Sequence, residues 1–160
     1  MATDSATPTT TPFLYHEPDL ERRPGYLVKR LSTTMRSRMD ESLRPLGLTV
    51  PQYVCMKALY DTPGVSGAEI ARRAFVSRQS VHQLLFELRA RGGVEQEPST
   101  NGLRRGVARL TEEGLANIEA ALAPVDALEE TMLSALSDEE RILFNDMLLR
   151  CEAAVKDHSG

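Results

Sequence analysis

The sequence lacks several features that mark large classes of proteins. Its 160 residues include no tryptophan, only 5% are aromatic, and the two cysteines have no CxxC or other metal-ligand spacing. Lone cysteines in a chain without a secretion signal are typical of a reducing compartment, so we expect the cytoplasm. We interpret Cys55 and Cys151 as small core residues. The alternative for Cys55, a redox sensor, requires an exposed thiol with a lowered pKa.

Membrane, export and catalytic signals are also missing. No apolar run approaches the roughly 18 residues of a membrane-spanning helix, and the segment MATDSATPTTTP has neither the basic nor the apolar region of a secretion signal. His16, His82 and His158 are far apart in the sequence. No Gly-rich phosphate loop or Ser/His/Asp grouping is present. We therefore expect no membrane partner, no metal, no cofactor and no enzymatic activity.

Charge is abundant but unevenly distributed. The formal net charge is −4, yet residues 66–109 hold eight arginines against four glutamates, a local net of +4. Residues 110–160 hold three basic and twelve acidic side chains, a net of −9. Arginine suits phosphate and guanine contacts. The distribution therefore indicates a nucleic-acid-binding region beside an acidic region with another purpose.

The spacing of apolar residues predicts a mainly α-helical chain after a flexible tail, residues 1–23. A helix from Pro24 carries apolar residues every four positions and ends before Pro45. Thr111 begins a long helix with two glutamates in its first turn. Three further helices begin at capping boxes, in Thr49–Gln52, Ser66–Glu69 and Ser137–Glu140.

The middle of the chain has the pattern of a winged helix-turn-helix. Short helices after Ser66 and Ser77 are joined by a tight turn at Phe75-Val76. After Gly92-Gly93 the apolar residues alternate, which predicts strands in 94–97 and 106–110 around a turn cluster. The result is a β-hairpin wing. The apolar face of the second helix consists of Val81, Leu84, Leu85 and Leu88.

The other face of this second helix is rich in hydrogen-bond donors, which indicates reading of base edges. The alternative is a solvated polar face. Arg104 and Arg105 at the hairpin tip suit minor-groove and phosphate contacts, or form an exposed basic loop. Arg72 and Arg73 contact phosphate or form ion pairs within the lobe. Phe86 lies off the apolar stripe, covered by the wing or touching DNA. The candidate DNA-binding residues are Ser66, Arg73, Ser77, Arg78, Gln79, Ser80, His82, Gln83, Arg104 and Arg105.

Over about residues 24–155 the sequence resembles the MarR family of winged helix-turn-helix transcriptional regulators. The resemblance is carried by LTVPQYVCMKAL at 48–59, SGAEIARRAFVSRQSVHQLLFELRARGGVEQEP at 66–98 and LRRGVARLTEEG at 103–114. It implies a homodimer with a DNA-binding region at 49–110 and a helical dimerisation region at 24–48 and 111–157. The chain departs from the family at Gly102, where an aspartate is usual, and at Gly93, where an apolar residue is usual.

The resemblance also implies a small, often aromatic, effector bound between the dimerisation helices and the DNA lobe. The candidates for its pocket are Met35, Arg38, Met39, Tyr53 and Met56; the methionines are alternatively core residues that fill irregular gaps. We therefore expect a homodimeric, sequence-specific repressor of a pseudo-palindromic operator in double-stranded DNA, relieved by such a ligand. The alternative is a winged-helix protein-interaction module without DNA binding, which the acidic residues Glu95 and Glu97 of the first wing strand favour.

Overall fold

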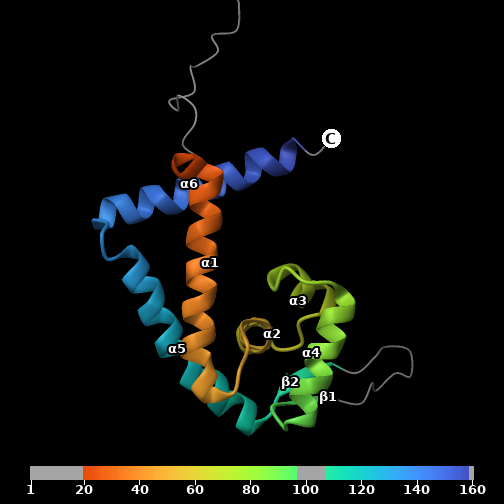
Figure 1. Ribbon diagram of the computed structural model, residues 1–160. Coiled ribbons are helices and arrows are strands. Elements are labelled where there is room, and N and C mark those ends of the chain that lie inside the picture. Colours follow the sequence, from red (N-terminus) through yellow and green to blue (C-terminus); the bar gives the residue numbers. More distant parts are fainter. Residues whose placement is uncertain (1–19, 97–106, 159–160) are drawn as a thin grey trace, which may run out of the picture. The chain divides into compact units, whose positions relative to one another are not determined.

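The computed structural model describes residues 20–96 and 107–158 (Figure 1). As predicted, the chain is mainly helical, with one two-stranded antiparallel sheet in the described part. It divides into two units, Met1–Arg36 and Ser37–Gly160, and the boundary falls within the first long helix. The elements in chain order are η1 (Leu20–Arg22), α1 (Pro24–Leu43), η2 (Arg44–Leu46), α2 (Val50–Asp61), α3 (Gly67–Arg73), α4 (Arg78–Ala90), β1 (Val94–Gln96), β2 (Ala108–Leu110), α5 (Glu112–Leu133) and α6 (Asp138–Asp157).

Short-range sequence signals set two helix starts as predicted. At the start of α2, the Thr49 hydroxyl accepts the backbone N–H of Gln52 at 3.4 Å, and the Gln52 side chain accepts the N–H of Thr49 at 3.1 Å. At the start of α6, Ser137 and Glu140 form the same reciprocal pair, at 3.3 and 2.8 Å. Each box satisfies backbone donors that have no partner inside the helix.

The third predicted capping box, Ser66 with Glu69, is only half formed, so that prediction was wrong. The Ser66 hydroxyl does cap α3, accepting the N–H of Glu69 at 3.2 Å. The Glu69 carboxylate instead accepts hydrogen bonds from Arg72 and Arg73, with Nε···O distances of 3.1 and 2.9 Å. Two guanidinium groups within the same turn of helix outcompete one backbone N–H for the carboxylate.

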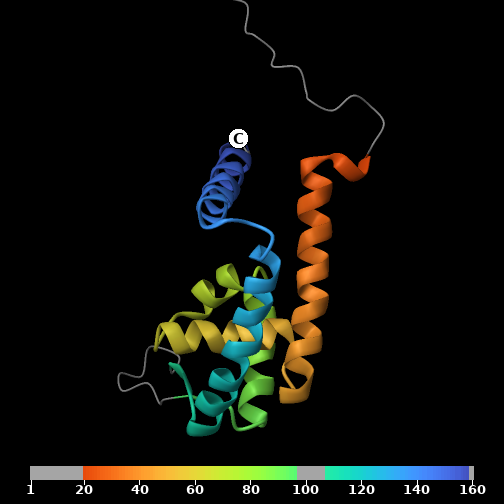
Figure 2. The ribbon, with the colours of Figure 1, turned by 90° about the vertical axis from the view of Figure 1, so that its left-hand side faces the viewer.

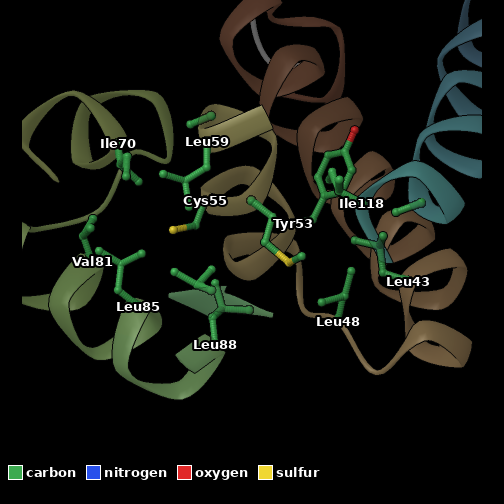
Figure 3. Packing of buried hydrophobic residues seen from close by; sticks show 14 of the residues in the cluster. Leu43, Leu48, Tyr53, Cys55, Leu59, Ile70, Val81, Leu85, Leu88 and Ile118 are labelled. Carbon is green, nitrogen blue, oxygen red and sulfur yellow. The ribbon is translucent and has the colours of Figure 1, made fainter. Parts of the chain in front are cut away.

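The hydrophobic core is built around α2, which contributes five of its buried residues (Figure 3). Figure 3 shows Ile70, Val81 and Leu85 of α3 and α4 towards one side of it, and Leu43 and Ile118 towards the other. All five of these side chains are buried. Because α2 packs on both sides, it joins the α3–α4 pair to α5 within one core.

The two cysteines differ, and only one matches the prediction. Cys55 is fully buried in this core, and burial raises the pKa of its thiol to about 12. A thiol of that kind is neutral and inaccessible, which fits a core residue and not a redox sensor. Cys151 lies exposed on α6, so its prediction as a core residue was wrong for the single chain.

The hairpin is fixed to the start of α5 by a close backbone approach. Strands β1 and β2 pair with Val94 opposite Leu110, and the hydroxyl of Thr111 donates to the carbonyl of Gly92 at 2.6 Å. Thr111 N–H also donates to the carbonyl of Gly93, at 3.2 Å. A Cβ on Gly114 would lie 1.9 Å from that Gly93 oxygen. The junction therefore requires glycine at position 114.

Helix α6 differs from α2, α3 and α4 in where it lies and in how exposed it is. It follows α5 and lies away from α2, α3 and α4 (Figures 1 and 2). None of its residues is buried. Its large exposed apolar side chains are Ile142, Leu143, Met147, Leu148, Leu149 and Val155.

Candidate nucleic-acid interface

Helix α4 has one buried face and one exposed face. Val81, Leu85 and Leu88 are buried, and Leu84 is half-buried, so the predicted apolar stripe anchors the helix. Five of the ten candidate DNA-binding residues are exposed within the first two turns of this helix. They are Arg78, Gln79, Ser80, His82 and Gln83.

The start of α4 is arranged as a hydrogen-bonded cap. The Ser77 hydroxyl accepts the N–H of Ser80 at 3.0 Å, and the two hydroxyl oxygens lie 2.8 Å apart. No acidic residue stands in the first turn, and Arg78 is its first helical residue. Unpaired N–H groups and the helix dipole make this end of α4 electropositive, which suits contact with a phosphate.

The arginines of α3 are engaged within the lobe. Arg73 binds Glu69, and its Nη1 lies 3.5 Å from the hydroxyl of Thr62. Hydrogen bonds from Arg73 and then Arg72 hold the pKa of the Glu69 carboxyl below its usual value. Of the two expected roles, the structure shows the ion pair for both arginines, each with Glu69. The Arg72 side chain is 78% exposed beside the same carboxylate.

The hairpin lies next to α4, and its base is formed by the paired strands β1 and β2. Val94 is buried, whereas Glu95 and Arg109, which face each other across the strands, are exposed. The tip, residues 97–106, lies outside the described residues, and so do the predicted contacts Arg104 and Arg105. The predicted wing is thus confirmed as a hairpin at its base.

Two exposed phenylalanines lie close in sequence to the candidate DNA-binding residues of α4. The Phe86 side chain on α4 is 64% exposed, so the described residues do not cover it. Phe75, in the turn between α3 and α4, is 90% exposed and has a φ of +53°. A left-handed backbone is costly for a residue with a Cβ. The sequence placed Phe75 in a turn but gave no signal of this conformation.

Glu87, the one acid of α4, was not among the predicted contact residues. It is half-buried and accepts a hydrogen bond from Gln83 at 2.9 Å and another from Gln52 at 3.2 Å. The i, i+4 spacing of Gln83 and Glu87 is a signal that sequence reasoning could have used. Gln52 lies 35 residues from Glu87 in the sequence, so no local pattern predicts their contact.

The five predicted effector-pocket residues have different surroundings. Tyr53 and Met56 are buried in the core, and Met39 is half-buried against it. Arg38 is 64% exposed and pairs with Glu41 at 2.9 Å. Met35 belongs to the other unit of the chain. The core interpretation therefore holds for Met56 and, with partial burial, for Met39.

A cavity of about 250 Å³ adjoins Met56. Its wall is partly apolar and partly charged, with the guanidinium of Arg91 donating to the carbonyl of Gly47 at 2.7 Å. The other lining residues are Leu46, Leu48, Leu88, Gly93, Glu113 and Asn117. Nearby, burial and then the carboxylates of Asp126, Glu129 and Asp61 raise the pKa of Tyr53. This phenol is therefore a neutral hydrogen-bonding group at ordinary pH.

Within residues 20–96 and 107–158, no three His, Cys, Asp or Glu side chains are grouped so that they could hold a metal ion. None of the described helices has the length and apolarity needed to cross a membrane.

The sequence is similar to those of known transcriptional regulators. Residues 46–105 match the model of the MarR family. The HTH-type transcriptional repressor Rv2887 of Mycobacterium tuberculosis is 36% identical over 124 residues, which are 78% of this chain and 89% of the repressor.

Solved structures agree with that similarity. The MarR family protein Rv2887 in complex with DNA has 34% sequence identity and a TM-score of 0.64, covering 81% of this chain and 97% of Rv2887. The Rv2887 complex with salicylic acid has 35% sequence identity and a TM-score of 0.66, covering 81% of this chain and 96% of Rv2887. The S. aureus MepR–DNA complex has a TM-score of 0.75 over 85% of this chain and 99% of MepR, at 24% identity, and shows the fold alone.

Proposed function

The chain belongs to the MarR family of winged helix-turn-helix transcriptional regulators, which are not enzymes, and we propose that it is a homodimeric, sequence-specific repressor of a pseudo-palindromic operator. The observation that carries the proposal is α4, with a buried apolar face and an exposed face of hydrogen-bond donors. A relative with 36% identity is a transcriptional repressor, and its structure with DNA is known. Since bacterial DNA lies in the cytoplasm, the protein acts there.

In this proposal α4 lies in the major groove. Arg78, Gln79, His82 and Gln83 read base edges, and a good bidentate pair contributes about 1–3 kcal/mol of discrimination. The serines at positions 66, 77 and 80 contact phosphates through hydroxyl or backbone N–H groups. Arg73 adds phosphate attraction, and Arg104 and Arg105 of the wing enter the minor groove.

The dimer is proposed from apolar surface that the single chain leaves exposed. On α6, Leu143, Met147, Leu148 and Val155 are between 40% and 72% exposed. In α1, the exposed fractions of Leu27, Val28 and Leu31 are 39%, 54% and 40%. Large apolar patches on a soluble chain mark interaction sites, and a second copy supplies the same patch by two-fold symmetry. The proposed dimerisation region is 24–48 with 111–157, and the DNA-binding region is 49–110.

A small aromatic acid is the proposed effector. Rv2887 has been solved with salicylic acid and with p-aminosalicylic acid. In this chain, the cavity beside Met56 is lined by apolar side chains, by the cation Arg91 and by the acid Glu113. The apolar side chains suit a ring, and Arg91 suits a carboxylate. The pocket residues predicted from the sequence, Met35, Arg38, Met39 and Tyr53, belong to α1 and α2. The ligand acts by favouring a lobe spacing that no longer fits the operator.

The first test is a DNA mobility-shift assay on the DNA flanking the protein's own gene. We expect a shift that depends on an inverted repeat and weakens steeply with salt. Six or more phosphate contacts lower affinity about a thousandfold or more between 50 and 200 mM salt. Salicylate should weaken the shift. A stable dimer with no DNA affinity at low salt would contradict the proposal and favour the protein-interaction module.

A pair of variants tests how the contacts are divided. Arg78→Ala should lose discrimination between operator and unrelated DNA, because it removes a base contact. Arg104→Ala should weaken binding to all sequences more evenly, because it removes a minor-groove and phosphate contact of the wing. Quantitative binding to matched and mismatched duplexes measures both. Identical behaviour of the two variants would show that this division is wrong.

A further inference from the structure

A chain of hydrogen bonds connects the start of α2 to the reading face of α4. The backbone N–H of Thr49 donates to the side-chain oxygen of Gln52 at 3.1 Å. The Gln52 amide nitrogen donates to one oxygen of Glu87 at 3.2 Å. The other oxygen of Glu87 accepts the amide nitrogen of Gln83 at 2.9 Å. Four residues from two helices thus form one continuous network with Gln83 at its outer end.

Chemistry fixes the direction of every bond in this network. An ionised carboxylate can only accept, so both glutamines must turn their NH₂ groups toward Glu87. Gln52 is 6% exposed and is the one buried polar residue in the described part of the chain. Its oxygen is already occupied by Thr49, so its amide has a single satisfied orientation. Gln52 therefore holds Glu87, and Glu87 holds Gln83.

The orientation of Gln83 matters for what its amide can recognise. A glutamine reads adenine with two bonds, accepting from the N6 amino group and donating to N7. Glu87 occupies only one of the two N–H groups of Gln83. The oxygen and the second N–H remain for a base, in one fixed order along the helix. Without Glu87, the amide can rotate by half a turn and present the reverse order.

Glu87 also has an electrostatic cost. It is the one acid of α4, on a helix whose proposed partner is a polyanion. A negative charge there weakens attraction to every DNA sequence alike. Its presence is explained if it contributes to sequence preference more than it costs in general affinity.

We propose that Glu87, held by Gln52, is a positioning residue that sets the base preference of Gln83 by fixing the orientation of its amide. The inference rests on the proposed function, since it requires that α4 reads DNA. It assigns a specificity role to two residues that do not themselves reach a base.

The test is selection of binding sequences from a library of randomised DNA duplexes, followed by affinity measurements on duplexes that differ at single base pairs. Wild-type protein should prefer one base pair at the Gln83 position by about tenfold. Gln83→Ala should abolish that preference. Glu87→Gln, which keeps the size of the side chain but offers one acceptor in place of two, should reduce the same preference by about threefold or more.

Two further variants separate positioning from general effects. Glu69→Gln removes the same charge from the same lobe without touching Gln83, so it should change affinity for all duplexes evenly. In a Gln83→Ala background, Glu87→Gln should have no further effect on preference at that base pair. Thermal unfolding of each variant verifies that it is folded, because Glu87→Gln leaves one acceptor for the two amides of Gln52 and Gln83.

The outcomes are distinct. If wild-type protein selects no sequence, the proposed function fails and this inference fails with it. If selection succeeds but Glu87→Gln changes affinity evenly, or changes preference at a base pair that Gln83→Ala leaves alone, the positioning role is overturned while the proposed function stands. A shared, non-additive effect at one base pair supports it.

Discussion

The winged-helix block buries its apolar side chains, whereas helix α6 leaves its own exposed. By the winged-helix block we mean residues 50–96 and 107–118, which share the hydrophobic core. In the block, Ile70 and Val81 are 0% and 1% exposed. On α6, Ile142 and Val155 are 73% and 72% exposed. The first region completes its core within a single chain, whereas the second leaves its apolar side chains exposed in that chain. Packing within one chain explains the first region, and the proposed dimer accounts for the second.

The largest expected effect comes from placing a charge on the apolar face of α6. Leu148→Glu should convert the dimer to monomer, weakening association about a thousandfold or more, because a carboxylate would be buried without a partner. Operator binding should fall with it, since two linked lobes bind far more tightly than one. Analytical ultracentrifugation over a range of concentrations measures the association.

The matched control is Asn145→Glu, which adds the same charge to the same helix at a residue that is already polar and exposed. It should leave the dimer largely intact. If both variants remain dimeric at low concentration, α6 is not the interface.

The second prediction concerns the closed packing of the winged-helix block. Gly114→Ala should lower the free energy of unfolding by roughly 2–4 kcal/mol, because the new Cβ would meet the backbone oxygen of Gly93. In an open helix the same change is neutral or stabilising by up to about 1 kcal/mol. Gly25 in α1, with no atom within 4 Å of its would-be Cβ, is the matched control. Urea denaturation of both variants measures the contrast, and equal effects would show that the junction is not tight.

The smallest effect is expected at Phe75. Phe75→Gly should raise the free energy of unfolding by about 1 kcal/mol, since a left-handed backbone suits glycine and the exposed ring loses few contacts. Dimerisation should not change. A loss of stability in denaturant titration would mean that the ring contributes contacts in the dimer. Parallel binding measurements would show whether it contributes to DNA affinity.

Much of the fold could be predicted because it depends on short-range signals. The Thr49 and Ser137 capping boxes, the stripe of α4 and the hairpin base each depend on residues within a few positions of one another. Ser66–Glu69 failed because Arg72 and Arg73 compete for the carboxylate, and the pattern alone cannot weigh such competition. Cys151 was misplaced because an apolar stripe does not say whether its cover comes from the same chain.

The candidate interface was predictable as a surface but not as a network. The spacing of Val81, Leu85 and Leu88 determines which side of α4 faces outward, so its donors could be named. That Glu87 bonds Gln52 depends on how α2 packs against α4, which no local pattern contains. The residues that orient a reader are therefore harder to find than the reader itself.

The central claim, two lobes held at a fixed separation on DNA, is tested most directly by changing the spacing of the operator. Affinity should be measured for the selected inverted repeat and for the same repeat with five base pairs inserted between its halves. About ten base pairs make one helical turn, so the insertion turns one half-site to the opposite side of the duplex. The account predicts a loss of affinity of about a hundredfold or more, and equal affinity for the two duplexes would contradict it.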